Sequence, residues 1–226
     1  MIALTSPMRR LRAFWKRLCK NSSGAVLIEF AFGLPFVVGF GMTGAELTNF
    51  VTTKMRVSQL ALQVADNASR VGTATVLATR QISEAQINDL LTGAGLQAGN
   101  LDFYEHGRVI VSSLQPLANP NTTSRYLIKW QRCRGLMPAT SSYGVQGDTD
   151  LTGITANGQL LTAPDDGAVI FVEVTYEYQP IIGLAFSKTS TITEIAAMTV
   201  RDNRDTTTVY NSEGVTASTC NLFTTT

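Results

Sequence analysis

The chain has 226 residues, of which 44% are hydrophobic, and a formal net charge of +1 at pH 7. Residues 1–24 hold 6 of the 18 basic residues and no acidic one, so residues 25–226 carry 12 basic against 17 acidic residues, a net charge of −5 (12 − 17). This balance argues against nucleic acid as a partner, which needs Lys and Arg clustered on the folded part. The length fits one membrane-anchored domain.

The N-terminal region pairs a basic segment with an apolar one. Between Glu29 and Glu46 lie 16 residues without a charge, and residues 25–28 extend the apolar run. Such a segment is about long enough to cross a bilayer as a helix, for which some 20 residues are needed. The basic residues before it keep the N-terminus cytoplasmic by the positive-inside rule, so we expect the rest of the chain to be exported.

Glu29 is the exception within this apolar segment. A carboxylate there costs roughly 2–3 kcal/mol unless it has a partner or reaches the interface. Cleavage after Gly24 would place a cationic amine on Ala25, four residues before Glu29, where it is a natural counter-ion within one helical turn or across to a neighbouring subunit. A favourable place near a helix N-terminus is the alternative explanation of Glu29. Its position five residues after Gly24 makes the pairing with a newly created N-terminus the better interpretation.

These features carry a family resemblance. The basic leader, Gly24, the apolar run and Glu29 at the fifth position after the cut resemble the class III signal of type IV prepilins. The run from Gly24 to Pro35, with Pro35 at mature position 11, is similar to the TadE-like pseudopilins of tight-adherence (Flp) pili. The resemblance implies a prepilin peptidase that cuts between Gly24 and Ala25, and an assembly role for Glu29 and Pro35.

From Ala25 the pattern predicts one helix to about Val71, because Gly72 is the first strong break. Such a helix spans about 70 Å at 1.5 Å per residue. Its first half is apolar nearly all round and its second half is amphipathic, which predicts a stem that continues into a globular head. Pro35 should kink it locally, and its glycines permit close helix–helix approach.

The head shows helix signals first and strand signals later. A short helix is expected at about Glu84–Leu91, with Ser83 as N-cap, Gln86 at the capping-box position and Gly93 as the stop. Segments 101–105 and 108–111 flank His106-Gly107 and predict a β-hairpin.

Three further strands follow in the head. Arg125–Cys133 alternates, with Tyr126, Ile128, Trp130 and Arg132 expected on one face. Strands are also expected over 168–178 and 190–201, although residues 194–198 would also fit a helix. The 33-residue stretch from Gly135 to Gly167, with a short strand near 159–161, is the kind of long loop that is usually functional or mobile.

The cysteines fit export. Cys19 lies in the leader, whereas Cys133 and Cys220 form an even pair in an oxidising compartment, which favours a disulfide over two separate buried thiols. The segment Trp130-Gln131-Arg132-Cys133 also resembles the one typical of TadE-like proteins, which is followed there by a late cysteine such as Cys220. Trp130 is expected to be a buried structural anchor.

Catalytic chemistry is not indicated. The exported part has one histidine, His106, and no GxSxG, HExxH, CxxC or phosphate-binding glycine loop. Asp148, Asp150 and Asp165-Asp166 offer oxygen ligands for Ca²⁺, but their spacing is not that of an EF-hand and solvated loop acids are the better interpretation. We therefore expect no enzyme activity, no metal, no cofactor and no small-molecule substrate.

The sequence as a whole predicts an α+β, pilin-like fold with a long N-terminal helix packed on an antiparallel β-sheet. Residues 1–24 form the leader, 25–72 the hydrophobic stem and 73–226 the head. The resemblance implies a minor pseudopilin of a tight-adherence type IV pilus, anchored in the bacterial inner membrane with its head in the periplasm and reaching the cell surface after assembly. Its expected partners are the peptidase, other pseudopilins and pilus subunits. Two alternatives stay open: an uncut signal-anchor protein, or a secreted domain cut before Glu46.

Overall fold

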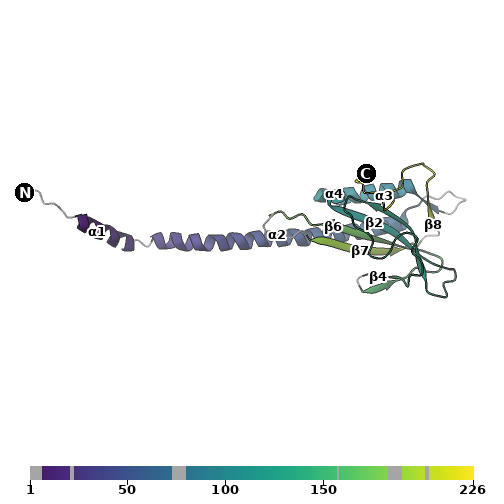
Figure 1. Cartoon of the computed structure of the whole chain (residues 1–226), viewed down its shortest axis with the longest axis horizontal. Helices are drawn as coiled ribbons and strands as arrows, with labels where there is room; N and C mark the ends of the chain where they lie inside the picture. The colour runs from purple at the N-terminus through teal and green to yellow at the C-terminus, as the bar shows by residue number, and fades with distance from the viewer. Residues whose placement is uncertain (1–6, 21–22, 73–79, 157, 183–189, 202–203) are drawn as a thin grey trace, which may run out of the picture. The chain divides into compact units, whose positions relative to one another are not determined.

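The computed structural model describes residues 7–20, 23–72, 80–156, 158–182, 190–201 and 204–226. The chain divides into two compact units, Met1–Thr48 and Asn49–Thr226. The boundary lies inside a single helix, α2 (Ser23–Arg70), which contributes residues to both units (Figure 1).

The first unit is helical in its described residues. It contains α1 (Pro7–Lys20) and the first part of α2. α2 continues through Pro35 as one element and is long and apolar enough to cross a membrane. Large apolar side chains on all sides of this part are exposed, namely Val26, Leu27, Ile28, Phe30, Phe32, Phe36, Val37 and Phe40.

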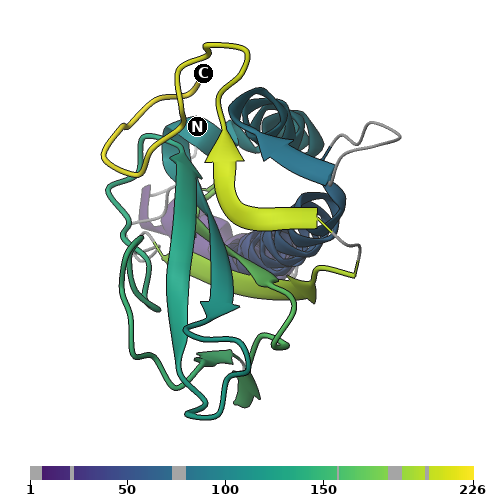
Figure 2. The ribbon, with the colours of Figure 1, turned by 90° about the vertical axis from the view of Figure 1, so that its right-hand side faces the viewer.

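The second unit is built on an antiparallel sheet of four strands in the order β3-β2-β6-β7 (Figure 2). Its strands are β2 (Gly107–Pro116), β3 (Tyr126–Arg134), β6 (Val169–Glu177) and β7 (Thr191–Thr199). β6 and β7 confirm the strands expected over 168–178 and 190–201. Residues 194–198, which would also have fitted a helix, belong to the strand β7.

One face of the sheet, the inner face, packs on two helices. These are the part of α2 in the second unit and α3 (Glu84–Gln97). α2 presents small and branched side chains at helical spacing, which lets its backbone lie close to the strands. The cluster includes Val57, Leu60, Ala61, Val64, Ala65 and Ala68 of α2, Ile87 and Leu91 of α3, and Val109, Val111, Ile170, Val172 and Val174 of the sheet.

The other face, the outer face, is covered by the segment that follows β3. A smaller cluster contains Leu114, Ile128 and Phe171 of the sheet together with Ile154 and Ala163 of this segment. The segment includes a two-stranded pair, β4 (Ile154–Ala156) with β5 (Gln159–Leu161), and β5 lies where the short strand was predicted.

Two strands that the sequence analysis did not assign complete the head. β1 (Arg80–Ser83) and β8 (Arg204–Tyr210) pair in parallel. The Arg204 guanidinium donates hydrogen bonds to the carbonyls of Ser69 and Val71 at the end of α2. A cation at a helix C-terminus satisfies carbonyls that have no partner within the helix.

α3 begins as expected but ends later. The Ser83 side chain accepts from the Gln86 backbone N–H while the Gln86 side chain accepts from the Ser83 N–H, which confirms the capping box. The expected stop at Gly93 is wrong, since α3 runs to Gln97. Burial of Ala94 in the core outweighs the weak helix propensity of glycine, and Gly95 provides the space that the Tyr104 ring fills.

The predicted hairpin around His106-Gly107 is wrong. Residues 99–101 form a 3₁₀ turn, η1 (Gly99–Leu101), and residues 103–106 form a short helix, α4 (Phe103–His106). Gly107 is the first residue of β2, whose partners are β3 and β6. A Cβ on Gly107 would lie 2.7 Å from the Thr175 carbonyl oxygen, so this glycine serves the close approach of two strands instead of a turn.

The expected shared face for Ile128 and Trp130 is also wrong. The register moves from Trp130 opposite Ser113 to Ile128 opposite Leu114, so Lys129 is an extra residue in β3. A bulge of this kind reverses the alternation of side chains. Ile128 therefore packs on the outer face and Trp130 in the inner core.

Candidate functional site

The residues predicted for processing and assembly lie on the first part of α2. Gly24, Ala25, Glu29 and Pro35 are all exposed. Ala25 and Glu29 are four residues apart in a continuous helix, and residues at this spacing share one face. An amine created at Ala25 would therefore lie within a turn of the Glu29 carboxylate.

Several glycines of α2 have no role in the packing of the described residues. A Cβ added at Gly24, Gly33, Gly39, Gly41 or Gly44 would meet nothing within 4 Å. A glycine in a helix interior costs roughly 0.5–1 kcal/mol relative to alanine. The described fold therefore gives no reason for these glycines, whereas a second helix that approaches closely would give one.

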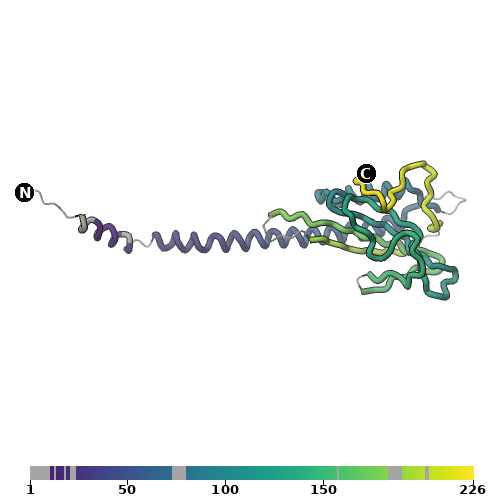
Figure 3. The backbone as a smooth tube through the Cα atoms, in the orientation of Figure 1, coloured from purple at the N-terminus to yellow at the C-terminus, as the bar shows by residue number. Residues whose placement is uncertain are grey.

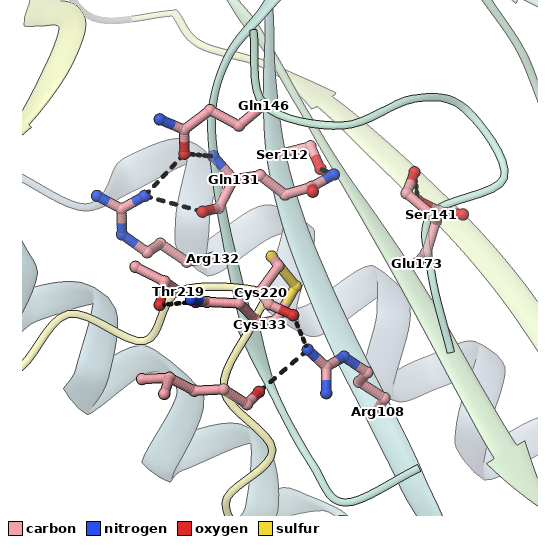
Figure 4. The surroundings of a disulfide bond; sticks show 12 residues. Arg108, Ser112, Gln131, Arg132, Cys133, Ser141, Gln146, Glu173, Thr219 and Cys220 are labelled. Atoms are coloured by element: carbon pink, nitrogen blue, oxygen red, sulfur yellow. Dashed lines mark hydrogen bonds between the residues drawn. A yellow bond between two sulfur atoms is a disulfide. The ribbon is translucent and has the colours of Figure 1, made fainter. Parts of the chain in front are cut away.

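The head brings together the two predicted cysteines. Cys133 of β3 and Cys220 form a disulfide, with their Cα atoms 4.7 Å apart and 87 residues apart in sequence (Figure 4). Backbone hydrogen bonds flank it, from Cys133 N to Ser218 O (2.8 Å) and from Gly135 N to Thr224 O (2.9 Å). The C-terminal tail, residues 211–226, is thus fixed along the end of β3 (Figure 3).

A buried arginine that the sequence analysis did not single out holds the same tail. Arg108, at the start of β2, is 1% exposed and donates to the carbonyl oxygens of Gly135 (3.0 Å), Cys220 (2.6 Å) and Leu222 (3.1 Å), two of these bonds reaching the tail (Figure 4). Its guanidinium carbon lies 4.1 Å from the centre of the Phe223 ring. Burial lowers the pKa of Arg108, but an arginine stays charged in proteins. The carbonyl dipoles and the aromatic face stabilise this charge.

A second arginine ties the tail to α3. Arg134 donates to the Thr92 hydroxyl (2.8 Å) and to the Ser218 hydroxyl (3.3 Å). The Ser218 hydroxyl donates in turn to the Asn88 side-chain oxygen (2.7 Å), and the Asn88 amide donates to the Thr216 carbonyl (2.9 Å). The tail is therefore held from two sides.

Trp130 is the expected buried anchor, and it also contacts β8. Its side chain is 2% exposed in the inner core. The indole N–H donates to the Thr206 carbonyl at 3.3 Å, and the Gln115 amide donates to the same oxygen. β8 is thus attached to the four-stranded sheet through side chains.

A buried ion pair joins β3 to the first turn of α3. The Arg132 guanidinium donates to both carboxylate oxygens of Glu84, and both residues are under a tenth exposed. Nε lies 2.8 Å from Oε2. The N-terminus of α3 adds a partial positive charge near the carboxylate.

Glu173 organises the start of the long loop on the outer face. It is 2% exposed on β6 and accepts from the Ser141 hydroxyl and from the Ser142 backbone N–H (2.9 Å). Burial raises the pKa of this carboxyl, and the two hydrogen bonds oppose the rise without cancelling it. Next to it, the rings of Tyr143 and Phe171 pack edge to face.

Three of the four loop acids considered as metal ligands have protein partners in the head. Asp148 accepts from the Val145 N–H at 2.8 Å, Asp150 lies 3.3 Å from the Arg125 guanidinium, and Asp166 accepts from the Asn119 amide. No group of three or more metal-ligating side chains occurs among the residues that the structure describes. His106 is half-buried at the end of α4.

Comparison with known proteins adds no assignment. No protein-family model, no curated protein and no solved structure matches this chain. Its function must therefore be argued from its own residues.

Proposed function

We propose that this chain is a minor pseudopilin of the tight-adherence type: a membrane-anchored subunit whose role is assembly. The observation that carries the proposal is the contrast within α2. Its first part exposes large apolar side chains on all sides and contains glycines that no described contact requires, whereas its second part is packed in the head. Membrane or neighbouring helices would cover the first part.

The sequence around the start of α2 supports prepilin-type processing. Cleavage between Gly24 and Ala25 by a prepilin peptidase would remove the basic leader, including α1. The stem then leaves the bilayer and packs among other stems, where Glu29 pairs with the amine of Ala25 of the same or a neighbouring subunit. This pairing offsets the cost of burying the carboxylate.

The head supports a specialised place in the pilus. By the family resemblance, major pilins of Flp type are little more than a stem, whereas here the second unit extends over Asn49–Thr226. The head is stabilised by a disulfide, by two arginines that bind the C-terminal tail and by a long loop that covers one face of the sheet. We infer a role in initiating or capping the pilus, or in adhesion, with the head in the periplasm and later at the cell surface.

The N-terminus and intact mass of the mature protein from native membranes test the proposal. A chain that starts at Ala25 is the expected result. A chain that starts at Glu46 would identify a secreted domain, and an intact Met1 would identify an uncut signal-anchor protein that binds an envelope partner. Either of these two results would overturn the pilus assignment.

A substitution separates assembly from simple anchoring. Glu29→Ala should abolish incorporation into filaments while the chain stays in the membrane, because the Ala25 amine loses its counter-ion. In an uncut anchor the same change would be harmless or stabilising, since it removes a charge from the bilayer. Glu213→Ala, an exposed carboxyl of the tail, is the matched control and should leave incorporation unchanged.

A further inference from the structure

β7 is an edge strand whose outer backbone groups can be identified from the register. Tyr178 N donates to Ser190 O and Val200 N donates to Ala168 O, each at 2.9 Å, just beyond the two ends of β7. In an antiparallel pair, residues alternate between those bonded to the neighbour and those that point away. Since 190 and 200 are both bonded to the β6 side, the odd-numbered residues of β7 direct their N–H and C=O groups to the open edge.

In the part of the chain that the structure describes, the edge of β7 has few of the features that usually prevent strand addition. The pairing of β6 with β7 is regular over nine residue pairs. The strand contains no proline, and its one charged residue, Glu194, lies 3.9 Å from Lys54 of α2. Among the described residues, none donates to or accepts from the odd-numbered backbone groups. Natural edge strands are normally protected by charges, proline or bulges. β7 has no proline, its pairing with β6 is regular and its one charge lies beside Lys54, so an edge of this length suits a partner strand.

A cleft of about 850 Å³ lies at the C-terminal end of this edge. It touches three consecutive residues of β7, Ala197, Met198 and Thr199. Ala197 packs toward the outer face and Met198 toward the inner face. A cavity that contacts both lies along the edge between the two faces, where Ala197 and Thr199 present their backbone groups.

The cleft concentrates positive charge in an otherwise acidic segment. Among the residues that the structure describes, four arginines and one acid line it, namely Arg70, Arg80, Arg201, Arg204 and Asp66. Residues 25–226 hold only 12 basic residues in all against 17 acidic ones, so a third of them gather here. Arg204 binds the end of α2, Arg70 contacts Asp66 at 2.8 Å with most of its side chain exposed, and Arg201 is exposed.

We propose that this edge and cleft bind an extended acidic segment of another polypeptide. The segment adds as a strand to β7, through the outward groups of residues such as Ala197 and Thr199, and its carboxylates lie near the exposed guanidinium groups of Arg70 and Arg201. Main-chain pairing supplies affinity in such strand addition, and guanidinium–carboxylate contacts supply selectivity for acidic sequences. The inference holds whether or not the chain is a pilus subunit.

The full chain in detergent micelles, titrated against a fluorescent peptide, tests the proposal. The probe is a peptide of alternating Thr and Val that ends in two Asp residues, and the control peptide ends in two Lys residues. Fluorescence anisotropy should show binding of the acidic peptide that weakens with salt, as expected for charge contacts near a surface. The basic peptide should bind at least about tenfold more weakly.

Two variants separate the two parts of the proposal. Arg201→Glu should weaken binding of the acidic peptide about tenfold or more, while Lys129→Glu, at an exposed position of β3 on the opposite edge of the sheet, should not. Ala197→Pro removes an outward N–H without touching the bonds to β6, and should also weaken binding. A probe N-methylated at alternate residues tests the same pairing with the unaltered protein.

Each outcome of these binding measurements supports or overturns a stated part of the proposal. Weakened binding with Arg201→Glu and with the N-methylated probe supports the proposal. Equal binding of the acidic and basic peptides, or no effect of Arg201→Glu, overturns it. Unchanged affinity of the N-methylated probe, or displacement of the probe by inorganic phosphate at the probe's own concentration, overturns strand addition and leaves a simple anion site.

Discussion

The two faces of the head sheet are buried by different means. The inner face packs on α2 and α3 through a large apolar cluster in which Ile87, Leu91 and Ile170 are fully buried. Half of the outer face is also apolar, around Leu114, Ile128 and Phe171. Its other half consists of polar groups with specific partners, such as Arg108 on tail carbonyls and Glu173 on loop donors.

This difference shows where stability and where specificity arise. Apolar burial tolerates changes of shape within limits, because it scales with area removed from water. A buried ion pair or charged hydrogen bond tolerates few substitutions, because the loss of one partner leaves the other buried without water or a counter-ion. The inner face therefore gives the head its core, and the polar half of the outer face fixes the position of the tail and the loop.

The disulfide should give the largest single effect. By the loop-closure estimate, a bridge between residues 87 positions apart stabilises the fold by between about 4 and 5 kcal/mol. The double variant Cys133→Ala/Cys220→Ala should lose an amount of this order in urea denaturation, and its tail should become sensitive to protease. Cys19→Ser is the matched control, since Cys19 is an exposed free thiol. A midpoint unchanged in the double variant would contradict this expectation.

Arg132→Met should destabilise the head by about 3–5 kcal/mol, because it leaves the Glu84 carboxylate buried without its partner. The double variant Arg132→Met/Glu84→Gln removes both charges and should recover part of the loss. Chemical denaturation of the four proteins of this cycle measures the coupling. If the double variant were as unstable as the sum of the single variants, the pair would not act as a unit.

Leu91→Ala probes the inner face and should cost about 2–5 kcal/mol, because the side chain is fully buried and leaves a cavity. Leu96→Ala on the same helix is the matched control: Leu96 is 80% exposed, so its loss should change the free energy of unfolding by less than about 0.5 kcal/mol. The two residue types have similar helix propensity. Equal effects would mean that α3 is not packed as described.

The inner face was largely predictable from the sequence and the polar half of the outer face was not. Helical spacing in α2, the capping box at Ser83 and the apolar run of β6 are local signals. The bulge at Lys129 is invisible to an alternation count, so the face of Trp130 was assigned wrongly. β1 has four residues and no local strand pattern. β8 carries a signal that the sequence analysis missed, because residues 206–210 are Thr, Val and Tyr, which favour strands.

The tail contacts illustrate the same limit. The disulfide was predicted because cysteines can be counted and their compartment inferred. Arg108 directly precedes the apolar run 109–111, and a charge at the edge of a buried strand is the one local signal that its burial left in the sequence. Two of its three acceptors are carbonyls more than a hundred residues away, and no pattern of residue types identifies backbone acceptors.

Glu173→Gln should give the smallest effect and the most specific one. Burial raises the pKa of Glu173 in the folded state, so the folded chain binds a proton more readily than the unfolded chain. The contribution of Glu173 to the free energy of unfolding is then fully present below its pKa in the unfolded chain, near 4.5. This contribution is lost as pH rises through its pKa in the folded chain. Glutamine does not ionise, and its side-chain oxygen still accepts from Ser142 N.

The difference in unfolding free energy between Glu173→Gln and the wild type should therefore change with pH. It should move in favour of the variant as pH rises from about 4.5 and become constant above the folded pKa. Glu213→Gln, at an exposed position, is the control and should follow the wild type. A difference that does not depend on pH would show that the loop contacts of Glu173 act through shape alone. The expected pH-dependent difference would show that burial of the ionised Glu173 destabilises the head, while its hydrogen bonds hold the loop at Ser141 and Ser142.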